Sequence, residues 1–305
     1  MNARFPASEQ ALADSRENIP RLLRLDELQP PLDLRSGSYR SRDDIPQKFP
    51  QHKASSVLAG LSMFRNYMKV VERDRAAARR GEYSDFLWGY SGLELTRLFE
   101  MYGARFCIEG LEQLQPWLSR PEREKGKVVF AVNHMSSLET MTLGGYITPY
   151  MPTTFVVKSA LAGGYFAPLI CSRPYVALER KNPLKDLETV LREGCEILQG
   201  GRSVIVFPQG TREEGQFSRS RFNSIAARLA AKADAALVPV ALRTDFWSRS
   251  RQKWTQYIPL LHPEREVHFA FGPPLAVTGR GKEAQNRAVE FISDKMRQWG
   301  VPVLD

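Results

Sequence analysis

The chain has 305 residues, of which 43% are apolar and 25% charged; this composition excludes overall disorder. A chain of this length buries a substantial core, as one large domain or two small ones. The net charge of +9 favours anionic partners, namely nucleic acid, a membrane surface or phosphate-bearing small molecules.

Targeting signals and cysteines bear on location. The first twenty residues lack the apolar run of a signal peptide, and no stretch of eighteen apolar residues predicts a spanning helix. The three cysteines are odd in number and lack metal-ligand spacing, which indicates a reduced compartment. We therefore expect a cytoplasmic protein that meets a membrane only peripherally.

The first hundred residues divide into an arm and a helical segment. Residues 1–50 are rich in Pro, Arg and Asp and predict an irregular arm. Residues 51–103 predict two helices; the first has an apolar face formed by Val57, Leu61, Phe64, Met68 and Val71. The second, over 83–103, is apolar over a wide arc. Core packing is the favoured interpretation of it, and contact with lipid headgroups is the alternative.

Beyond residue 103, strands alternate with helices. Strands are expected within 105–114, 126–134, 153–161, 174–180, 203–212, 235–242 and 266–275, and helices within 182–201, 223–233 and 281–300. This alternation predicts an α/β fold with a mostly parallel central sheet flanked by helices, to which the N-terminal helical segment is added. The domain would span 104–280, followed by a C-terminal helix and tail over 281–305.

Three of these strands end in polar residues: Asn133-His134, Glu179-Arg180-Lys181 and Pro208-Gln209-Gly210-Thr211-Arg212. Functional groups gather at the carboxyl ends of strands in open α/β sheets. We therefore expect a histidine, two arginines and a glycine turn to share one rim. Taken singly, each piece also fits a structural histidine, a solvated charge run or a plain turn.

The stretch from His134 to Glu139 has two interpretations. Five residues on a helix turn through roughly 500°, so the two side chains can meet only across a bend. Ser136-Ser137-Leu138-Glu139 also fits a capping box, with Ser136 at the N-cap and Glu139 at the third helical position. These residues alone do not choose between a helix start and an active site.

The blocks NHMSSLE, KSAL, YVALER, FPQGTR and LVPVAL, in this order and spacing, resemble the 1-acyl-sn-glycerol-3-phosphate acyltransferases of the lysophospholipid acyltransferase superfamily. The resemblance covers about residues 104–277. It implies transfer of a fatty acyl group from acyl-CoA or acyl-carrier protein to a lysolipid hydroxyl. The thioester is the co-substrate, and neither a further cofactor nor a metal is expected.

The same resemblance implies roles for individual residues. His134 matches the catalytic general base, and Glu139 matches the acid that orients it. Arg180 and Arg212 match the phosphate-binding arginines, and Lys158 would add a third cation. Gln209, Gly210 and Thr211 form the turn beside the phosphate, where a glycine permits close backbone approach.

The chain departs from the family pattern at three places. Glu139 stands where the family usually has Asp, and Gln209 where it usually has Glu. The usual basic, Gly-containing stretch after the turn is replaced by FSRSRFNS, in which Arg219 and Arg221 would supply the charge. These departures leave the reaction class intact but bear on the acceptor.

Residues 244–257 interleave aromatic and basic side chains. A basic surface loop with partly buried tryptophans is weighed equally with contact to anionic headgroups. The same pattern suits stacking on nucleic-acid bases, which we rank last as a function because it leaves the strand-end blocks unexplained.

The expectation is therefore an O-acyltransferase acting on a lysolipid acceptor at an anionic membrane surface in phospholipid biosynthesis. The alternatives are an inactive lipid-binding or membrane-adaptor protein of the same fold, and an acyltransferase with a non-phosphatidate acceptor.

Overall fold

The computed structural model describes residues 32–34, 36–48, 57–121, 124, 126–249 and 259–305. Within them, one sheet has the strand order β1-β2-β11-β8-β3-β6-β4-β5, and its neighbours are parallel except for β1 with β2 and β8 with β11. The prediction of a mostly parallel sheet is confirmed. The strands are β1 (Tyr39–Arg40), β2 (Phe106–Glu109), β3 (Val128–Val132), β4 (Thr153–Lys158), β5 (Val176–Leu178), β6 (Ser203–Val206), β8 (Ala236–Arg243) and β11 (Val267–Phe271).

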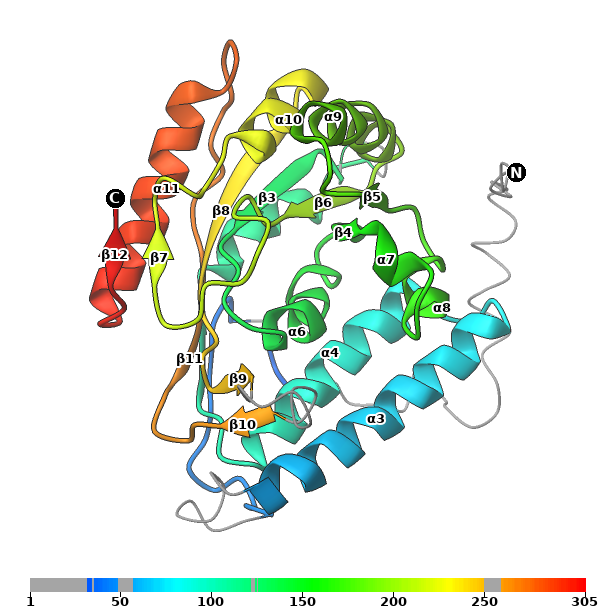
Figure 1. The fold of residues 1–305 in the computed structure, drawn as a ribbon, viewed down its shortest axis with the longest axis vertical. Helices are drawn as coiled ribbons and strands as arrows, with labels where there is room; N and C mark the ends of the chain where they lie inside the picture. The colour runs from blue at the N-terminus through cyan, green and yellow to red at the C-terminus, as the bar shows by residue number, and fades with distance from the viewer. Residues whose placement is uncertain (1–31, 35, 49–56, 122–123, 125, 250–258) are drawn as a thin grey trace.

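Helices cover both faces of this sheet (Figure 1). Strand β3 shows why its sequence is apolar without alternation, because Phe130 packs into the core on one face and Val129 into the core on the other. One face is covered by α4 (Asp85–Glu100), α6 (Leu138–Ile147) and the 3-10 helix η1 (Leu111–Trp117). The other is covered by α9 (Pro183–Gln199), α10 (Ile225–Ala233) and α11 (Lys282–Gln298).

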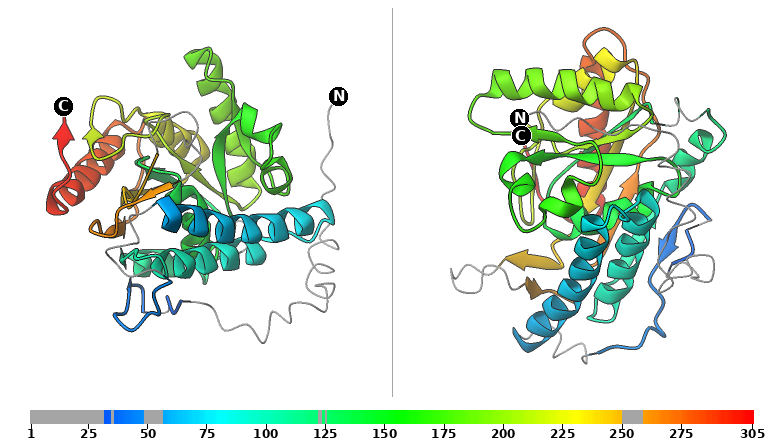
Figure 2. Two further views of the ribbon diagram at one scale, coloured as in Figure 1. Left: turned by 60° about the horizontal axis from the view of Figure 1, so that its bottom comes forward. Right: turned by 90° about the vertical axis from the view of Figure 1, so that its right-hand side faces the viewer.

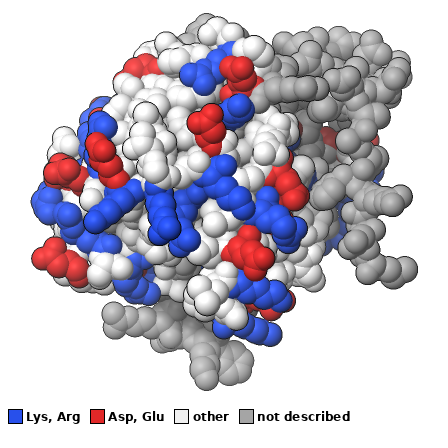
Figure 3. All heavy atoms as spheres, turned by 90° about the horizontal axis from the view of Figure 1, so that it is seen from above, with Lys and Arg blue, Asp and Glu red and all other residues white. Residues whose placement is uncertain are grey.

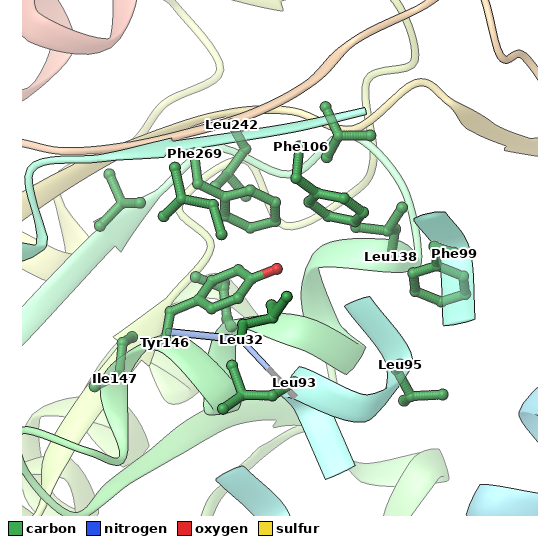
Figure 4. Packing of buried hydrophobic residues seen from close by; sticks show 14 of the residues in the cluster. Leu32, Leu93, Leu95, Phe99, Phe106, Leu138, Tyr146, Ile147, Leu242 and Phe269 are labelled. Atoms are coloured by element: carbon green, nitrogen blue, oxygen red, sulfur yellow. The ribbon is translucent and has the colours of Figure 1, made fainter. Parts of the chain in front are cut away.

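Helix α6 lies between the sheet and α4. Figure 4 shows its Tyr146 between Phe269 of the sheet and Leu93 of α4. The two helices meet at Gly92 and Gly145, where a Cβ added to Gly92 would lie 2.6 Å from the backbone nitrogen of Gly145. Side chains do not fit at this crossing, so the glycines set the position of the helix that carries Glu139.

Helices α3 (Val57–Arg79) and α4 lie side by side beneath α6 (Figure 2). Both helices were predicted, and α4 is buried along most of its length, as its favoured interpretation required. The predicted apolar face of α3 packs inward only in part, because Val71 is buried and Phe64 and Met68 lie partly buried against the core. Its buried face carries Met63, Tyr67 and Val71, whereas Val57 and Leu61 are exposed. The buried face follows from contacts with α4, the next helix along the chain, and with β10, which lies far away in sequence.

The arm and the C-terminal tail both contribute strands. In the described part of the arm, β1 pairs with β2, and Leu32 packs into the core beside α4 and α6 (Figure 4). At the other end of the chain, β12 (Val303–Leu304) pairs with β7 (Phe217–Ser218). The remaining elements of the described residues are α7 (Ser159–Ala162), α8 (Ala167–Ile170), β9 (Trp247–Arg249) and β10 (Pro259–Leu261). In the described ranges, no helix combines the length and apolar character needed to cross a bilayer.

Candidate active site

His134 and Glu139 meet across the bend between β3 and α6. The imidazole Nδ1 lies 2.8 Å from Glu139 Oε1, and that oxygen also accepts the backbone N–H groups of Met135 and Ser136, each at 2.8 Å. Three donors on one oxygen fold the chain tightly around the carboxylate. Because α6 begins at Leu138, Glu139 lies in its first turn, where a negative charge is favoured.

The second carboxylate oxygen holds the pair from the other side. Glu139 Oε2 accepts hydrogen bonds from Ser136 Oγ at 2.9 Å and from Thr244 Oγ1, just beyond β8, at 2.6 Å. Complete burial by itself raises the pKa of this carboxyl, but the hydrogen bond and charge of His134, with help from Thr244, outweigh it and lower the pKa. An ionised carboxylate only accepts, so His134 Nδ1 carries the proton and Nε2 is left as the basic nitrogen.

The helix-start interpretation also holds, in altered form. Glu139 accepts the N–H of Ser136 as a capping box requires, while Ser136 Oγ accepts from the N–H of Leu138 instead of that of Glu139. The helix starts one residue later than expected, and Ser137 makes no side-chain cap. One carboxylate therefore serves both the helix end and the histidine.

A cavity of about 800 Å³ opens beside His134. The imidazole is 12% exposed and stacks on Phe207, with ring centroids 4.3 Å apart. From there the cavity runs between β4, α6 and α8 to α3 and α4, and its walls are mostly apolar. This shape suits an elongated hydrocarbon group with one end at the histidine.

The predicted cations lie on the same rim. Lys158 ends β4, Arg180 follows β5 and Arg212 follows β6, and all three line the cavity, as do Gly210 and Thr211. Of the other predicted site residues, Glu139 and Gln209 are buried behind this surface and do not line it. The three strand ends predicted from the sequence therefore meet at one place, together with Lys158, which the family resemblance implied.

The turn after β6 is held in an unusual backbone conformation. Gly210 has φ of 70°, which favours glycine, and a Cβ there would meet no atom within 4 Å, so the requirement is conformational. Arg180 also has a positive φ, of 59°, and donates from Nη1 to the carbonyl of Gly210. A non-glycine residue in this region is strained, and such strain clusters at functional sites.

Gln209 takes part in the structure behind the turn. Its Oε1 accepts the backbone N–H of His134 at 2.7 Å, and its Nε2 donates to the buried carboxylate of Glu213. Arg221 Nη1 lies 2.9 Å from Glu213 Oε1, and its Nη2 donates to Thr211 Oγ1. The carboxylate that the family usually has at residue 209 is thus replaced in this chain by the carboxylate of Glu213. Arg221 pairs with it outside the cavity, and Arg219 does not line the cavity either.

Restoring the family's glutamate at residue 209 is expected to lower both the stability and the activity of this protein. Gln209→Glu removes a donor to Glu213 and sets two carboxylates together in a buried site, and the lost hydrogen bond to a charged group alone costs about 1.5–3 kcal/mol. We expect a lower melting temperature and lower kcat. The double variant Gln209→Glu/Glu213→Gln restores one donor and one acceptor and should recover much of both. A single Gln209→Glu variant indistinguishable from wild type contradicts this account.

Sequence reasoning missed several residues at this site. Thr244 holds Glu139, Phe207 stacks on His134, and Glu213 donates its backbone N–H to the carbonyl of His134 at 2.8 Å. The position of Phe207 directly before the Pro-Gln-Gly-Thr turn was the one available signal. Thr244 and Glu213 carry no local signal, because their roles depend on which distant strand ends meet.

The aromatic and basic segment 244–257 falls partly outside the described residues, which end at 249 and resume at 259. Within the described part, Phe246 and Trp247 are buried in the core, and Trp247 packs edge-on against Tyr67 and Phe99. These two aromatics therefore serve packing and are not available to headgroups or bases.

Comparison with known proteins identifies the class. Residues 105–243 match the family model described as Acyltransferase. The fold is similar to that of the crystal structure of the 1-acyl-sn-glycerophosphate (LPA) acyltransferase PlsC from Thermotoga maritima, with a TM-score of 0.55 and 19% sequence identity over 81% of this chain and 94% of that chain. The matched region contains β2, β3, β4, β5, β6 and β8, and hence every predicted site residue. The family model thus identifies residues 105–243 as an acyltransferase domain.

Two relatives narrow the class. The chain is 26% identical over 220 residues to the 1-acyl-sn-glycerol-3-phosphate acyltransferase of Pseudomonas aeruginosa, covering 69% of this chain and 76% of the relative. It is 29% identical over 154 residues to a probable 1-acyl-sn-glycerol-3-phosphate acyltransferase of Mycoplasma pneumoniae. This match covers 49% of this chain and 56% of that relative. The matched domain and the two relatives support the lysophospholipid acyltransferase superfamily and an O-acyltransferase activity for this chain. The expected resemblance is confirmed.

Proposed function

We propose that this enzyme transfers a fatty acyl group from acyl-CoA or acyl-carrier protein to the free hydroxyl of a lysophosphatidate-like acceptor. One observation carries the proposal: a single cavity joins His134 and three cationic residues at its rim to a long apolar interior. The names of the two relatives give 1-acyl-sn-glycerol 3-phosphate, an acceptor of this kind, as their substrate. Such a product belongs to phospholipid biosynthesis.

The reaction follows from the arrangement of the pair. His134 Nε2 removes the proton of the acceptor hydroxyl, and the oxygen attacks the thioester carbonyl carbon. The tetrahedral intermediate collapses with cleavage of the C–S bond, and the imidazolium returns its proton to the leaving thiolate. Glu139 holds the ring by Nδ1 and stabilises the imidazolium while it exists.

The cationic rim would hold the acceptor phosphate. Arg212 and Arg180 can offer paired, charge-assisted hydrogen bonds, and Lys158 adds a point charge. Because Arg180 also donates to Gly210, it would fix the turn as well as bind the anion. Neutral lysolipids would lose these contacts and bind more weakly.

Replacing Arg212 with methionine tests the acceptor. A hydrogen bond to a charged group contributes about 1.5–3 kcal/mol, so the KM for lysophosphatidate should rise about tenfold or more, with a smaller change in kcat. Arg228→Met, on the exposed side of α10, is the matched control and should leave both constants unchanged. Free-thiol release with lysophosphatidate and with a neutral lysolipid measures the difference. Equal KM values in wild type and Arg212→Met would remove Arg212 from the acceptor site.

The exposed end of α3 is the proposed membrane contact. Val57, Leu58 and Leu61 are 54%, 70% and 42% exposed, and Arg65 and Lys69 continue the same helix face. Apolar side chains followed by cations suit the boundary of an anionic membrane. Figure 3 looks onto the opposite end of the molecule, around α9 and α10, and shows Lys and Arg side chains mixed with Asp and Glu. A mixed surface of this kind gives no support to nucleic-acid binding there.

Transfer itself is the decisive test. The protein with an acyl thioester and lysophosphatidate should release free thiol and form diacylglycerol phosphate. An inactive lipid-binding protein of the same fold would bind the acceptor and release no thiol. Comparing CoA and carrier-protein thioesters at equal chain length then identifies the donor.

A further inference from the structure

The cavity ends in polar side chains. Along β4 it extends from Lys158 at the rim to Thr154, about 13 Å at the rise of a strand. The cavity is also lined by Asp74, Tyr83 and Arg173, whose side chains are all strongly buried. A cavity for a plain hydrocarbon chain would be apolar at this end.

A row of rings connects the histidine to this deep end. His134 stacks on Phe207 at 4.3 Å, Phe207 on Phe155 at 5.9 Å, and Phe155 meets Trp88 edge-on at 5.6 Å. The guanidinium of Arg173 lies 4.2 Å above Trp88. Three aromatic rings therefore separate Arg173 from the histidine, so a group bound at Arg173 belongs to the far part of an acyl chain.

Arg173 has an unused hydrogen-bond donor. Its side chain is 9% exposed and packs on Trp88 and Tyr83, while Nε lies 3.3 Å from Asp85 Oδ1. Among the described residues, neither Nε nor Nη2 has an acceptor in hydrogen-bonding geometry. A buried donor left unpaired costs about 1–3 kcal/mol. Because Arg173 lines the cavity, a ligand atom could serve as a hydrogen-bond acceptor for its guanidinium.

The charges around Arg173 balance without a ligand. Asp85 accepts two hydrogen bonds from Arg202 at 2.8 Å each, and Arg73 lies 2.8 Å from Asp74 and 2.7 Å from Glu94. The positive groups are Arg73, Arg173 and Arg202, and the negative groups are Asp74, Asp85 and Glu94. An anionic ligand would add an uncompensated charge, so a neutral acceptor fits better.

We propose that this end of the cavity is a polar subsite for a hydroxyl group on the distal part of the acyl chain. The hydroxyl oxygen accepts a hydrogen bond from the guanidinium of Arg173, which lines the cavity. Tyr83 packs beneath Arg173 and is buried. A chain ending in a plain methyl group would leave the Arg173 donor unpaired. The inference rests on the proposed function, and it names the acyl donor's class as hydroxylated fatty acyl thioesters.

The test compares donors of equal length on the wild-type protein. Hexadecanoyl, ω-hydroxyhexadecanoyl and a mid-chain hydroxyhexadecanoyl group are supplied on whichever thioester carrier supports transfer, with lysophosphatidate as acceptor. We expect kcat/KM for the better hydroxylated donor to exceed that for the plain donor by about tenfold, the value of one hydrogen bond to a charged group. An ω-carboxyl donor should transfer worse than the hydroxylated one.

Two variants locate the preference. Arg173→Met should abolish it while transfer of the plain chain continues. Arg75→Met is the matched control, because Arg75 is also buried and stacked on a tyrosine, Tyr165 at 3.6 Å, yet does not line the cavity. That control should keep the preference.

Each outcome has a separate meaning. Wild-type protein that uses the plain donor as well as or better than both hydroxylated donors overturns the subsite, whether or not Arg173→Met folds. A preference for the ω-carboxyl donor overturns its assignment to a neutral hydroxyl. A preference that survives Arg173→Met overturns the role of Arg173. Absence of transfer from every donor would instead contradict the proposed function.

Discussion

Replacing His134 with alanine is expected to lower acyl transfer by about 10²–10⁴-fold, the usual contribution of a general base. The fold should survive, because the bend depends on main-chain groups that alanine retains. The His134 N–H bonds Gln209, and its carbonyl accepts the N–H of Glu213. Free-thiol release and circular dichroism of the same preparation measure the two effects.

His268→Ala is the matched control. His268 is also 12% exposed, stacks on Trp299 at 4.8 Å and lies 3.3 Å from the carboxylate of Glu266. It therefore loses similar packing and charge contacts, but at a place outside the cavity. Its activity should stay near that of wild type. Full activity in His134→Ala would dismiss the histidine as the base.

Replacing Glu139 with glutamine is expected to lower kcat by about 10²-fold or more. The amide keeps the size of the side chain, and the hydroxyls of Ser136 and Thr244 can rotate to accept from it, so the protein should fold. It cannot, however, stabilise the imidazolium that forms when His134 takes the proton. Steady-state kinetics on saturating acceptor give the comparison.

Ser136→Ala separates the cap from the catalytic role. Loss of a cap typically costs about 1 kcal/mol of stability and should lower kcat much less than Glu139→Gln does. If Glu139 served the helix end alone, the two variants would lose similar stability and little activity.

The pH dependence of stability gives a second test of the Glu139 carboxylate. The folded pKa of Glu139 is lowered, so its ionised form stabilises the protein above the ordinary glutamate pKa, and this stability is lost as the pH falls. Glu139→Gln lacks that contribution.

Much of the fold could be predicted because its signals are local. The strands are apolar runs followed by turn residues, and the helices repeat their apolar residues at helical spacing, so neither needs a distant partner to be recognised. The site followed from the same reasoning, since parallel strands place His134, Arg180 and Arg212 at one edge whatever lies between them. Their roles in catalysis and acceptor binding stay predictions until the variants are measured.

The sequence by itself determined the class of fold, the strand-end rim and the family. Only the tertiary structure decided which face of α3 is buried, how Glu213 supplies the charge absent from Gln209, and that the cavity ends at Arg173. The physical reason is the distance along the chain over which each kind of interaction acts. Periodicity and turn chemistry act over a few residues, whereas burial and charge pairing depend on segments brought together from far along the chain. Asp85 and Arg202, 117 residues apart, form an ion pair beside Arg173 that no local sequence pattern predicts.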